Sequence, residues 1–114
     1  MNTLSENLFN VNLEAGLLGA ILIESSLMRS ALTKIKQENI FFHHAHREIY
    51  RAMLDLQAEG IQPEIVDVTH RLRRNGSRLT AVDILELTRE ASLPNFEARC
   101  LQVYELFHRR EAQA

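Results

Sequence analysis

Three of the five histidines, His43, His44 and His46, stand close together in the sequence, and Glu48 follows them. In a helix, His43 and His46 would share one face, where two imidazoles can bind the same metal ion. A structural zinc site needs four ligands, however, and the sequence offers neither a cysteine pair nor a second histidine pair at a suitable spacing. We therefore expect no metal site at these histidines.

Covalent catalysis and phosphate chemistry have little support elsewhere in the sequence. Cys100 is the only cysteine, and it lies on the apolar stripe of an expected helix, which favours a buried packing thiol over a nucleophile. The sequence has no Gly-x-x-x-x-Gly-Lys-Ser/Thr pattern that could hold a nucleotide, and no arrangement of its scattered carboxylates selects a catalytic pair. We expect a chain that is not itself an enzyme and that uses no cofactor.

One dense basic stretch contains Arg71, Arg73, Arg74 and Arg78, together with His70. The favoured interpretation is a helix C-terminus whose cations complement the helix dipole, followed by a solvated loop. The alternative is a docking patch for an acidic partner or for passing DNA. The net charge of -2, from 13 basic and 15 acidic side chains, argues against unaided DNA binding as the main role.

The elements that must position these residues are all predicted to be helices. Apolar residues recur at helical spacing in six segments, and no alternating pattern of strand type extends beyond a few residues. Caps and breakers mark the ends of these segments: Asn12 before the first, Gly60 after the third, Thr80 with Asp83 before the fifth, and Pro94–Asn95 before the last. The remaining expected helices span about 27–35, 43–59 and 63–74, and the apolar stripes of the later helices include Val66, Val82, Leu85 and Leu101. The sequence thus predicts an all-α domain, a compact orthogonal bundle of about six helices over residues 12–112, after a flexible lead-in over residues 1–11.

Two features of the expected helices bear on packing. Gly16 and Gly19 stand about one turn apart in the first helix, where glycine is unfavourable by about 1 kcal/mol relative to alanine, so we expect another helix to cross closely there. The last helix has more apolar residues than one core-facing stripe needs, and Leu106 with part of Tyr104 or Val103 forms the surplus. We therefore expect weak self-association through Tyr104 and Leu106.

Several short motifs follow one another in a defined order. A Glu-x-x-x-Leu-Gly pattern at Glu14, Leu18 and Gly19 precedes the apolar segment 40–42, which we expect to plug the space between helices, and His46-Arg47 comes next. The motif positions further along are Ile49, Tyr50, Ala52, Met53, Leu56, Gly60, Pro63, Asn95, Tyr104 and Arg109 or Arg110. Over residues 11–111, this order resembles the N-terminal domain of DnaB-type replicative DNA helicases. Departures at Ala15, at Asn39 and after Pro63 indicate a divergent version, such as a phage or plasmid one.

The resemblance implies a non-catalytic protein-interaction domain of a hexameric replicative helicase. In such a protein, these domains associate with one another, in pairs and around the ring, and contact primase and in some systems the helicase loader, whereas the motor with its P-loop lies further along the chain. DNA would be contacted only indirectly. The resemblance also implies that His46 and Arg47 are structural, with His46 partly buried and Arg47 reaching a carboxylate or a helix end.

Two other functions remain open from the sequence. The helicase-binding C-terminal domain of a primase resembles the same small helical fold, and a small helical DNA-binding protein could use the stretch from Arg71 to Arg78. The longest apolar run, Ala15 to Ile23, has nine residues, against about 20 for a membrane-spanning helix. With a single cysteine, which cannot form an intrachain disulfide, this short run leads us to expect a cytoplasmic protein that does not bind membranes.

Overall fold

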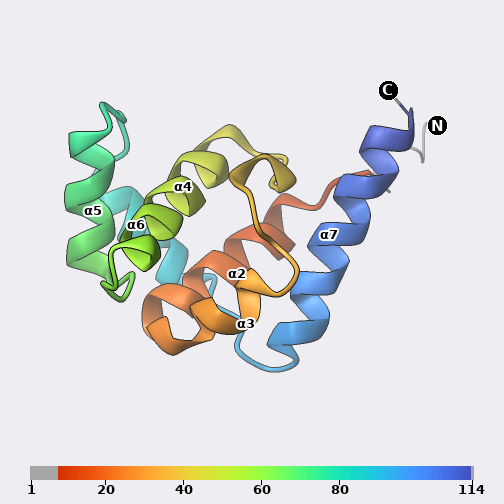
Figure 1. Cartoon of the computed structure of the whole chain (residues 1–114), viewed down its shortest axis with the longest axis horizontal. Coiled ribbons are helices and arrows are strands. Elements are labelled where there is room, and N and C mark those ends of the chain that lie inside the picture. The colour runs from red at the N-terminus through yellow and green to blue at the C-terminus, as the bar shows by residue number, and fades with distance from the viewer. Residues whose placement is uncertain (1–7, 114) are drawn as a thin grey trace.

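Helix α2 (Val11–Ile23) lies in the middle of the fold, with the other helices around it (Figure 1). The computed structural model describes residues 8–113, so most of the predicted lead-in over 1–11 lies outside the described residues. Every residue of α2 from Glu14 to Leu22 is buried. A helix that is apolar on nearly all sides must be enclosed by others, and α2 packs against α4, α6 and α7.

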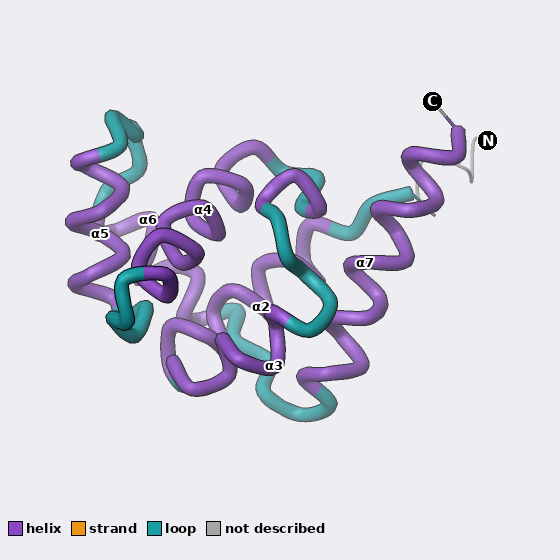
Figure 2. The backbone as a smooth tube through the Cα atoms, viewed as in Figure 1, coloured by secondary structure: helices purple, strands orange, loops and turns teal. Residues whose placement is uncertain are grey.

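The surrounding helices follow in chain order: η1 (Ser25–Leu27), α3 (Met28–Leu32), η2 (Glu38–Ile40), α4 (His44–Ala58), α5 (Ile65–Arg74), α6 (Ala81–Arg89) and α7 (Phe96–Gln113). Short loops join them, and the described residues contain no strand (Figure 2). The predicted all-α fold of about six helices is therefore confirmed, with six α-helices among residues 8–113. Helices α5 and α7 lie at opposite ends of the longest axis of the molecule, which measures 41 Å (Figure 1). Within the described part of the chain, no helix is both long and apolar enough to cross a membrane.

Local signals place most helix ends where the sequence predicts them. Thr80 and Asp83 form a reciprocal capping box at the start of α6, as expected. Gly60 follows the end of α4 with a φ of 77°, a conformation that favours glycine because it has no Cβ. Asn95 has a φ of 58° just before α7, and asparagine is one of the few other residues that tolerate this region.

The predicted cap of α2 is wrong. The side chain of Asn10, and not that of Asn12, accepts the backbone N–H of Leu13 at 2.9 Å, so the helix begins at Val11. Asn12 lies exposed in the first turn. Asparagine is a good cap at either position. The cap at Asn10 is the one that agrees with the burial of Glu14 one turn later.

The close crossing predicted at Gly16 and Gly19 is confirmed, and the partner is α6 with the loop that follows it. The backbone N–H of Ser92 donates to the carbonyl of Gly16 at 3.1 Å. A Cβ on Gly19 would clash with the carbonyl oxygen of Leu87 and would lie 3.1 Å from Cα of Ala91. Only glycine allows the two backbones to come this close.

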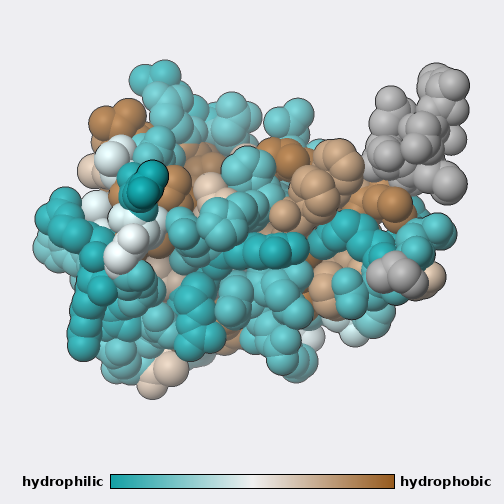
Figure 3. All heavy atoms as spheres, turned by 90° about the horizontal axis from the view of Figure 1, so that it is seen from above, coloured by the Kyte–Doolittle hydropathy of each residue, from teal (hydrophilic) through white to brown (hydrophobic). Residues whose placement is uncertain are grey.

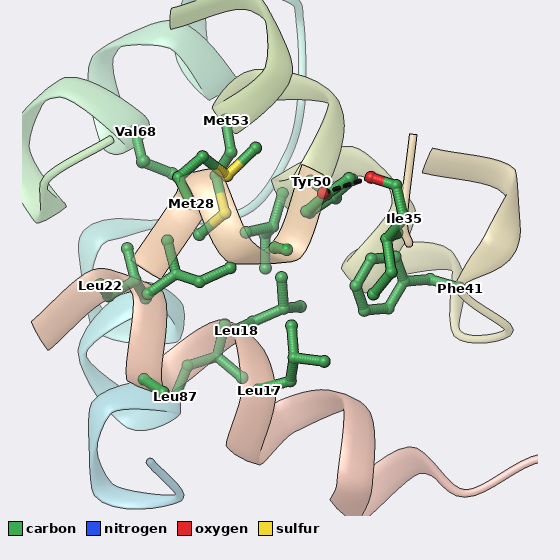
Figure 4. Close-up of a cluster of buried hydrophobic side chains, with 14 of the residues drawn as sticks. Leu17, Leu18, Leu22, Met28, Ile35, Phe41, Tyr50, Met53, Val68 and Leu87 are labelled. Carbon is green, nitrogen blue, oxygen red and sulfur yellow. Dashed lines mark hydrogen bonds between the residues drawn. The ribbon is translucent and has the colours of Figure 1, made fainter. Parts of the chain in front are cut away.

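The core is a single cluster of buried side chains between α2, α3, α4, α5, α6 and the start of α7. Figure 4 shows its central part, which includes Leu17, Leu18, Leu22, Met28, Ile35, Phe41, Tyr50, Met53, Val68 and Leu87. The hydroxyl of Tyr50 donates to the carbonyl oxygen of Ile35 at 2.5 Å, so the one polar atom of this ring is satisfied inside the core. Burial raises the pKa of the Tyr50 hydroxyl, which stays protonated.

Several apolar residues expected on core-facing stripes are exposed instead. Val66, Val82 and Leu85 are exposed by half or more, and Leu101 by 39%. Helices α5 and α6 lie at the edge of the fold, so narrow stripes suffice there: Val68 and Leu72 in α5, Ile84 and Leu87 in α6. The segment 40–42 is also only partly a plug, since Ile40 and Phe41 are buried and Phe42 is 39% exposed.

Candidate functional site

A buried hydrogen bond between the side chains of Glu14 and His46 holds the start of α4 against α2. Oε1 of Glu14 lies 2.8 Å from Nδ1 of His46, and both side chains are almost fully buried. The same carboxylate accepts the backbone N–H groups of Phe42 at 2.7 Å and His43 at 3.2 Å. A carboxylate only accepts hydrogen bonds, so Nδ1 of His46 donates. Glu14, the first residue of the Glu-x-x-x-Leu-Gly pattern, thus binds the loop before α4.

Two arginines bind backbone carbonyl groups at the end of η2, next to this loop. Nε of Arg47 donates to the carbonyl oxygen of Phe41, the residue that caps η2, at 2.7 Å, so Arg47 does reach a helix end. Arg110, near the end of α7, donates from Nη1 to the carbonyl oxygen of Leu8 and from Nη2 to that of Ile40, each at 2.8 Å. The sequence motif leaves Arg109 and Arg110 as alternatives, and the structure shows Arg110 in this role.

Aromatic rings complete this contact, which we call the Arg110 clasp: Leu8, Phe9, Ile40, Phe42, Phe107 and Arg110. The rings of Phe9 and Phe42 stack with centroids 4.1 Å apart, and the guanidinium carbon of Arg110 lies 5.4 Å from the centroid of Phe42. Burial lowers the pKa of Arg110, but an arginine remains charged throughout the range in which proteins fold. The clasp fastens the far end of α7 to the body of the domain.

The three clustered histidines have separate roles. Nδ1 of His43 accepts the backbone N–H of Ala45 and caps α4, His44 pairs with Glu48 at 3.4 Å on the surface, and His46 is buried with Glu14. Partial burial, together with the nearby His46, lowers the pKa of His43, and Glu14 offsets part of this change. Within the described residues, no three or more side chains of metal-ligating type converge.

Cys100 is buried in the core, as predicted. Burial raises the pKa of its thiol to about 12, with a smaller contribution from Glu97. A nucleophilic cysteine needs a lowered pKa, because the thiolate is the reactive form. The environment of Cys100 therefore suits packing.

A hollow of about 610 Å³ lies between η2, α4 and the end of α5, and most of its charged residues are already paired. Arg51 bridges Glu38 and Asp55, and Glu48 accepts the hydroxyl of Ser77 at 2.7 Å. The side chains of this hollow thus form a network of surface ion pairs and hydrogen bonds.

The six residues predicted as a partner surface lie in three separate places. Arg71 is not free, because it donates to Glu59 at 2.7 Å and joins α5 to α4. This hydrogen bond lowers the pKa of Glu59 and raises that of Arg71. Arg73, Arg74 and Arg78 are exposed and pair with no carboxylate among residues 8–113.

Tyr104 and Leu106 belong to α7, which lies at the other end of the molecule (Figure 1), and they face different hollows. Tyr104 borders a hollow beside Lys34 and Ile40, whereas Leu106 borders one beside Asn10 and Leu13. Two positions apart in a helix correspond to a rotation of about 200°, which explains the separation. Figure 3 shows a face on which hydrophilic residues cover most of the area and hydrophobic residues form separate spots.

Comparisons with known proteins agree with this architecture. A family model described as "DnaB-like helicase N terminal domain" matches residues 6–105. The chain is 35% identical over 104 residues to a replicative DNA helicase DnaB of Rhodothermus marinus, and the match spans 88% of this chain but only 11% of that relative.

The fold is also similar to a crystal structure of the N-terminal domain of DnaB helicase from Mycobacterium tuberculosis. The TM-score is 0.83 at 24% sequence identity, over 92% of this chain and 78% of that one. At this identity, the likeness concerns the fold.

Proposed function

Since the chain belongs to the family of DnaB-like helicase N-terminal domains, we propose that it is the non-catalytic interaction domain of a hexameric replicative DNA helicase. In this role it associates with the same domain of neighbouring subunits and offers a surface to primase or to a helicase loader, in the cytoplasm. The family match favours the helicase over the primase interpretation, because the matching model is that of the helicase domain.

The observation that carries this proposal, beside the family, is the use of the buried polar groups. The side chains of Glu14 and His46, which are both buried, bind each other, and Glu14 also binds the backbone of 42–43. Among the described residues, every buried side-chain nitrogen or oxygen has a hydrogen-bond partner. A general acid or base must be able to reach its substrate. Because these buried groups stabilise the fold, we assign the function of the domain to its surface.

We assign self-association to α7. Its inner side packs Phe96, Cys100 and Val103 into the core, and Leu106 remains half-buried on a flank. Helix α7 is 18 residues long, or about 27 Å, and it lies at one end of the molecule, where its last turns run past the buried residues of its first half (Figure 1). A helix that extends past its own core offers its flank to a neighbouring copy.

Sedimentation velocity over roughly a hundredfold range of protein concentration tests this assignment. We expect the wild type to dimerise weakly and Leu106→Glu to shift toward monomer. Leu101→Glu is the matched control, because Leu101 is exposed on another side of the same helix. A wild type that stays monomeric throughout, or equal effects of the two variants, would contradict an interface at Leu106.

The partner assignment needs a separate titration. Isothermal calorimetry with the helicase-binding domain of the primase from the same organism should show saturable binding. Gel shifts with single-stranded DNA at low micromolar protein should show none, since the chain carries a net charge of -2. Salt-sensitive DNA binding without primase binding would support the DNA-binding alternative instead.

A further inference from the structure

The outer side of α5 is an unpartnered surface at the end of the molecule opposite to α7 (Figure 1). Val68, Thr69 and Leu72 turn one side of this helix toward the core. Positions 66, 70 and 73 recur at helical spacing on the other side, and all three are exposed. Val66 is 64% exposed, the highest fraction among the large apolar residues described.

At the N-terminal end of α5, the outer side borders a mostly apolar hollow. A hollow of about 290 Å³ lies between the end of α2 and the start of α5. Its lining is mostly aliphatic, with two polar residues, and consists of Leu22, Ile23, Ile65 and Val66 with Ser25 and Glu64. Ile23 is 53% exposed, so two large aliphatic side chains stand in water at the same hollow. Apolar residues grouped around a concavity are typical of the place where a partner inserts an apolar side chain.

At the C-terminal end of α5, the outer side is basic. Glu59 neutralises Arg71 on the side toward α4, and Arg74 also lies near enough to Glu59 to lower its pKa. Arg73, on the outer side, and Arg78, in the loop after α5, are exposed and have no carboxylate partner among residues 8–113. The chain as a whole is acidic, with a net charge of -2, so this is a local excess of positive charge.

We propose that the outer side of α5 docks an acidic amphipathic segment of a partner protein. An apolar side chain of that segment enters the hollow at Ile23 and Val66, and its carboxylates face Arg73 and Arg78. The proposal rests on the assignment of this chain as an interaction domain, and it specifies the chemistry of one partner. From position 66 to 73 the helix rises about 10 Å, so a partner helix would place its apolar and acidic residues about two turns apart.

Charge complementarity favours an acidic peptide over the other occupants. A nucleic-acid backbone would use the arginines and leave Ile23 and Val66 in water. Affinity for DNA grows with the number of phosphates neutralised, and two or three arginines give little of it. A second copy of this basic surface would bring like charges together.

The probe for the test is a fluorescein-labelled, helix-favouring peptide of about 16 residues, with two leucines one turn apart and three glutamates two turns further along the same side. Fluorescence anisotropy with the intact chain should show saturation with a Kd below about 1 mM. Arg73→Glu combined with Arg78→Glu should weaken binding by about tenfold, and Val66→Ser by several-fold. These residues are exposed, so the thermal midpoints of the variants should stay close to that of the wild type.

Arg109→Glu combined with Lys36→Glu is the matched control, because both residues are exposed and lie outside α5, and the pair changes the net charge equally. It should leave the affinity for the peptide unchanged, and a peptide with lysines in place of the glutamates should not bind. The proposal is overturned if binding of the acidic peptide does not saturate, or if the control pair weakens peptide binding as much as the α5 pair does. It is also overturned if an oligothymidylate displaces the peptide and its own binding depends on the same arginines. Sedimentation that turns monomeric in the α5 pair would assign this surface to self-association instead.

The peptide measurement is independent of α7. If it fails while the primase titration and the effect of Leu106→Glu hold, the domain keeps its proposed function and binds partners elsewhere. If those two fail while the peptide binds to the α5 surface, the interaction domain stands and its assignment to primase and to α7 does not.

Discussion

Replacing Gly19 by alanine should separate α2 from α6 and destabilise the domain. The added Cβ would clash with the carbonyl oxygen of Leu87, and it would lie 3.0 Å from the carbonyl carbon of Leu87 and 3.1 Å from Cα of Ala91. These are backbone atoms, so no side-chain rotation can relieve the clash. Overpacking of this kind usually costs 1–3 kcal/mol or more, and the better helix propensity of alanine returns about 1 kcal/mol.

We expect the free energy of unfolding to fall by about 2 kcal/mol, and the thermal midpoint by about 10 °C. Urea denaturation followed by far-ultraviolet circular dichroism measures the first, and a thermal scan measures the second. Gly16→Ala is the matched control in the same helix, since its Cβ would lie 3.2 Å from the carbonyl oxygen of Glu90 and 3.4 Å from Cβ of Ser92. A small shift relieves these contacts, so its stability should remain within about 1 kcal/mol of the wild type. A Gly19→Ala variant as stable as the wild type, or as stable as Gly16→Ala, would refute the close backbone contact.

Three further predictions concern the polar groups around the loop before α4. Glu14→Gln removes one of two acceptor oxygens that serve three N–H donors, so urea denaturation should show a loss of about 1–3 kcal/mol, and an unchanged midpoint would contradict the buried network. Arg110→Met removes the hydrogen bonds to two backbone carbonyl groups, so its free energy of unfolding should fall by about 1–3 kcal/mol. Arg109→Met changes an exposed neighbour and should stay within about 0.5 kcal/mol of the wild type. His43→Asn keeps a good helix cap without an imidazole. Because the pKa of His43 is lowered in the fold, its contribution to stability is complete above about pH 6.5 and is lost as the pH falls through the pKa of the folded state. The thermal midpoints at about pH 7.5 and 5 should therefore differ less in the variant than in the wild type, and equal differences would exclude His43 as a source of acid destabilisation.

The sequence predicts the helices well because their ends are encoded locally. The Thr80–Asp83 box and Gly60 act within one turn of chain, and both work as the pattern indicates. The cap of α2 shows where local reasoning fails. Asn10 and Asn12 are both good caps, and the choice between them depends on Glu14, which has to reach a loop 28 residues further along.

The faces of the outer helices were harder to predict for a related reason. An apolar residue such as Val66 or Leu85 satisfies the helical period equally well whether another element covers it or not. Whether such a residue is buried depends on the position of α5 and α6 at the edge of the fold. The sequence of either helix alone does not reveal that position. The basic stretch likewise divides into Arg71, bound to Glu59, and free arginines only when α4 is placed beside it.

The Arg110 clasp has a consequence for the order in which the domain folds. It joins Arg110 to Leu8 across 102 positions and to Ile40 across 70. Closing a loop of about 100 residues in an unfolded chain costs about 3 kcal/mol more than closing a three-residue turn. Two hydrogen bonds near the surface do not offset that entropy alone, so the clasp can close only after α2 and α4 have brought its parts together. It should therefore form late on the folding pathway, and in native-state hydrogen exchange the last turns of α7 should open before the central helices do.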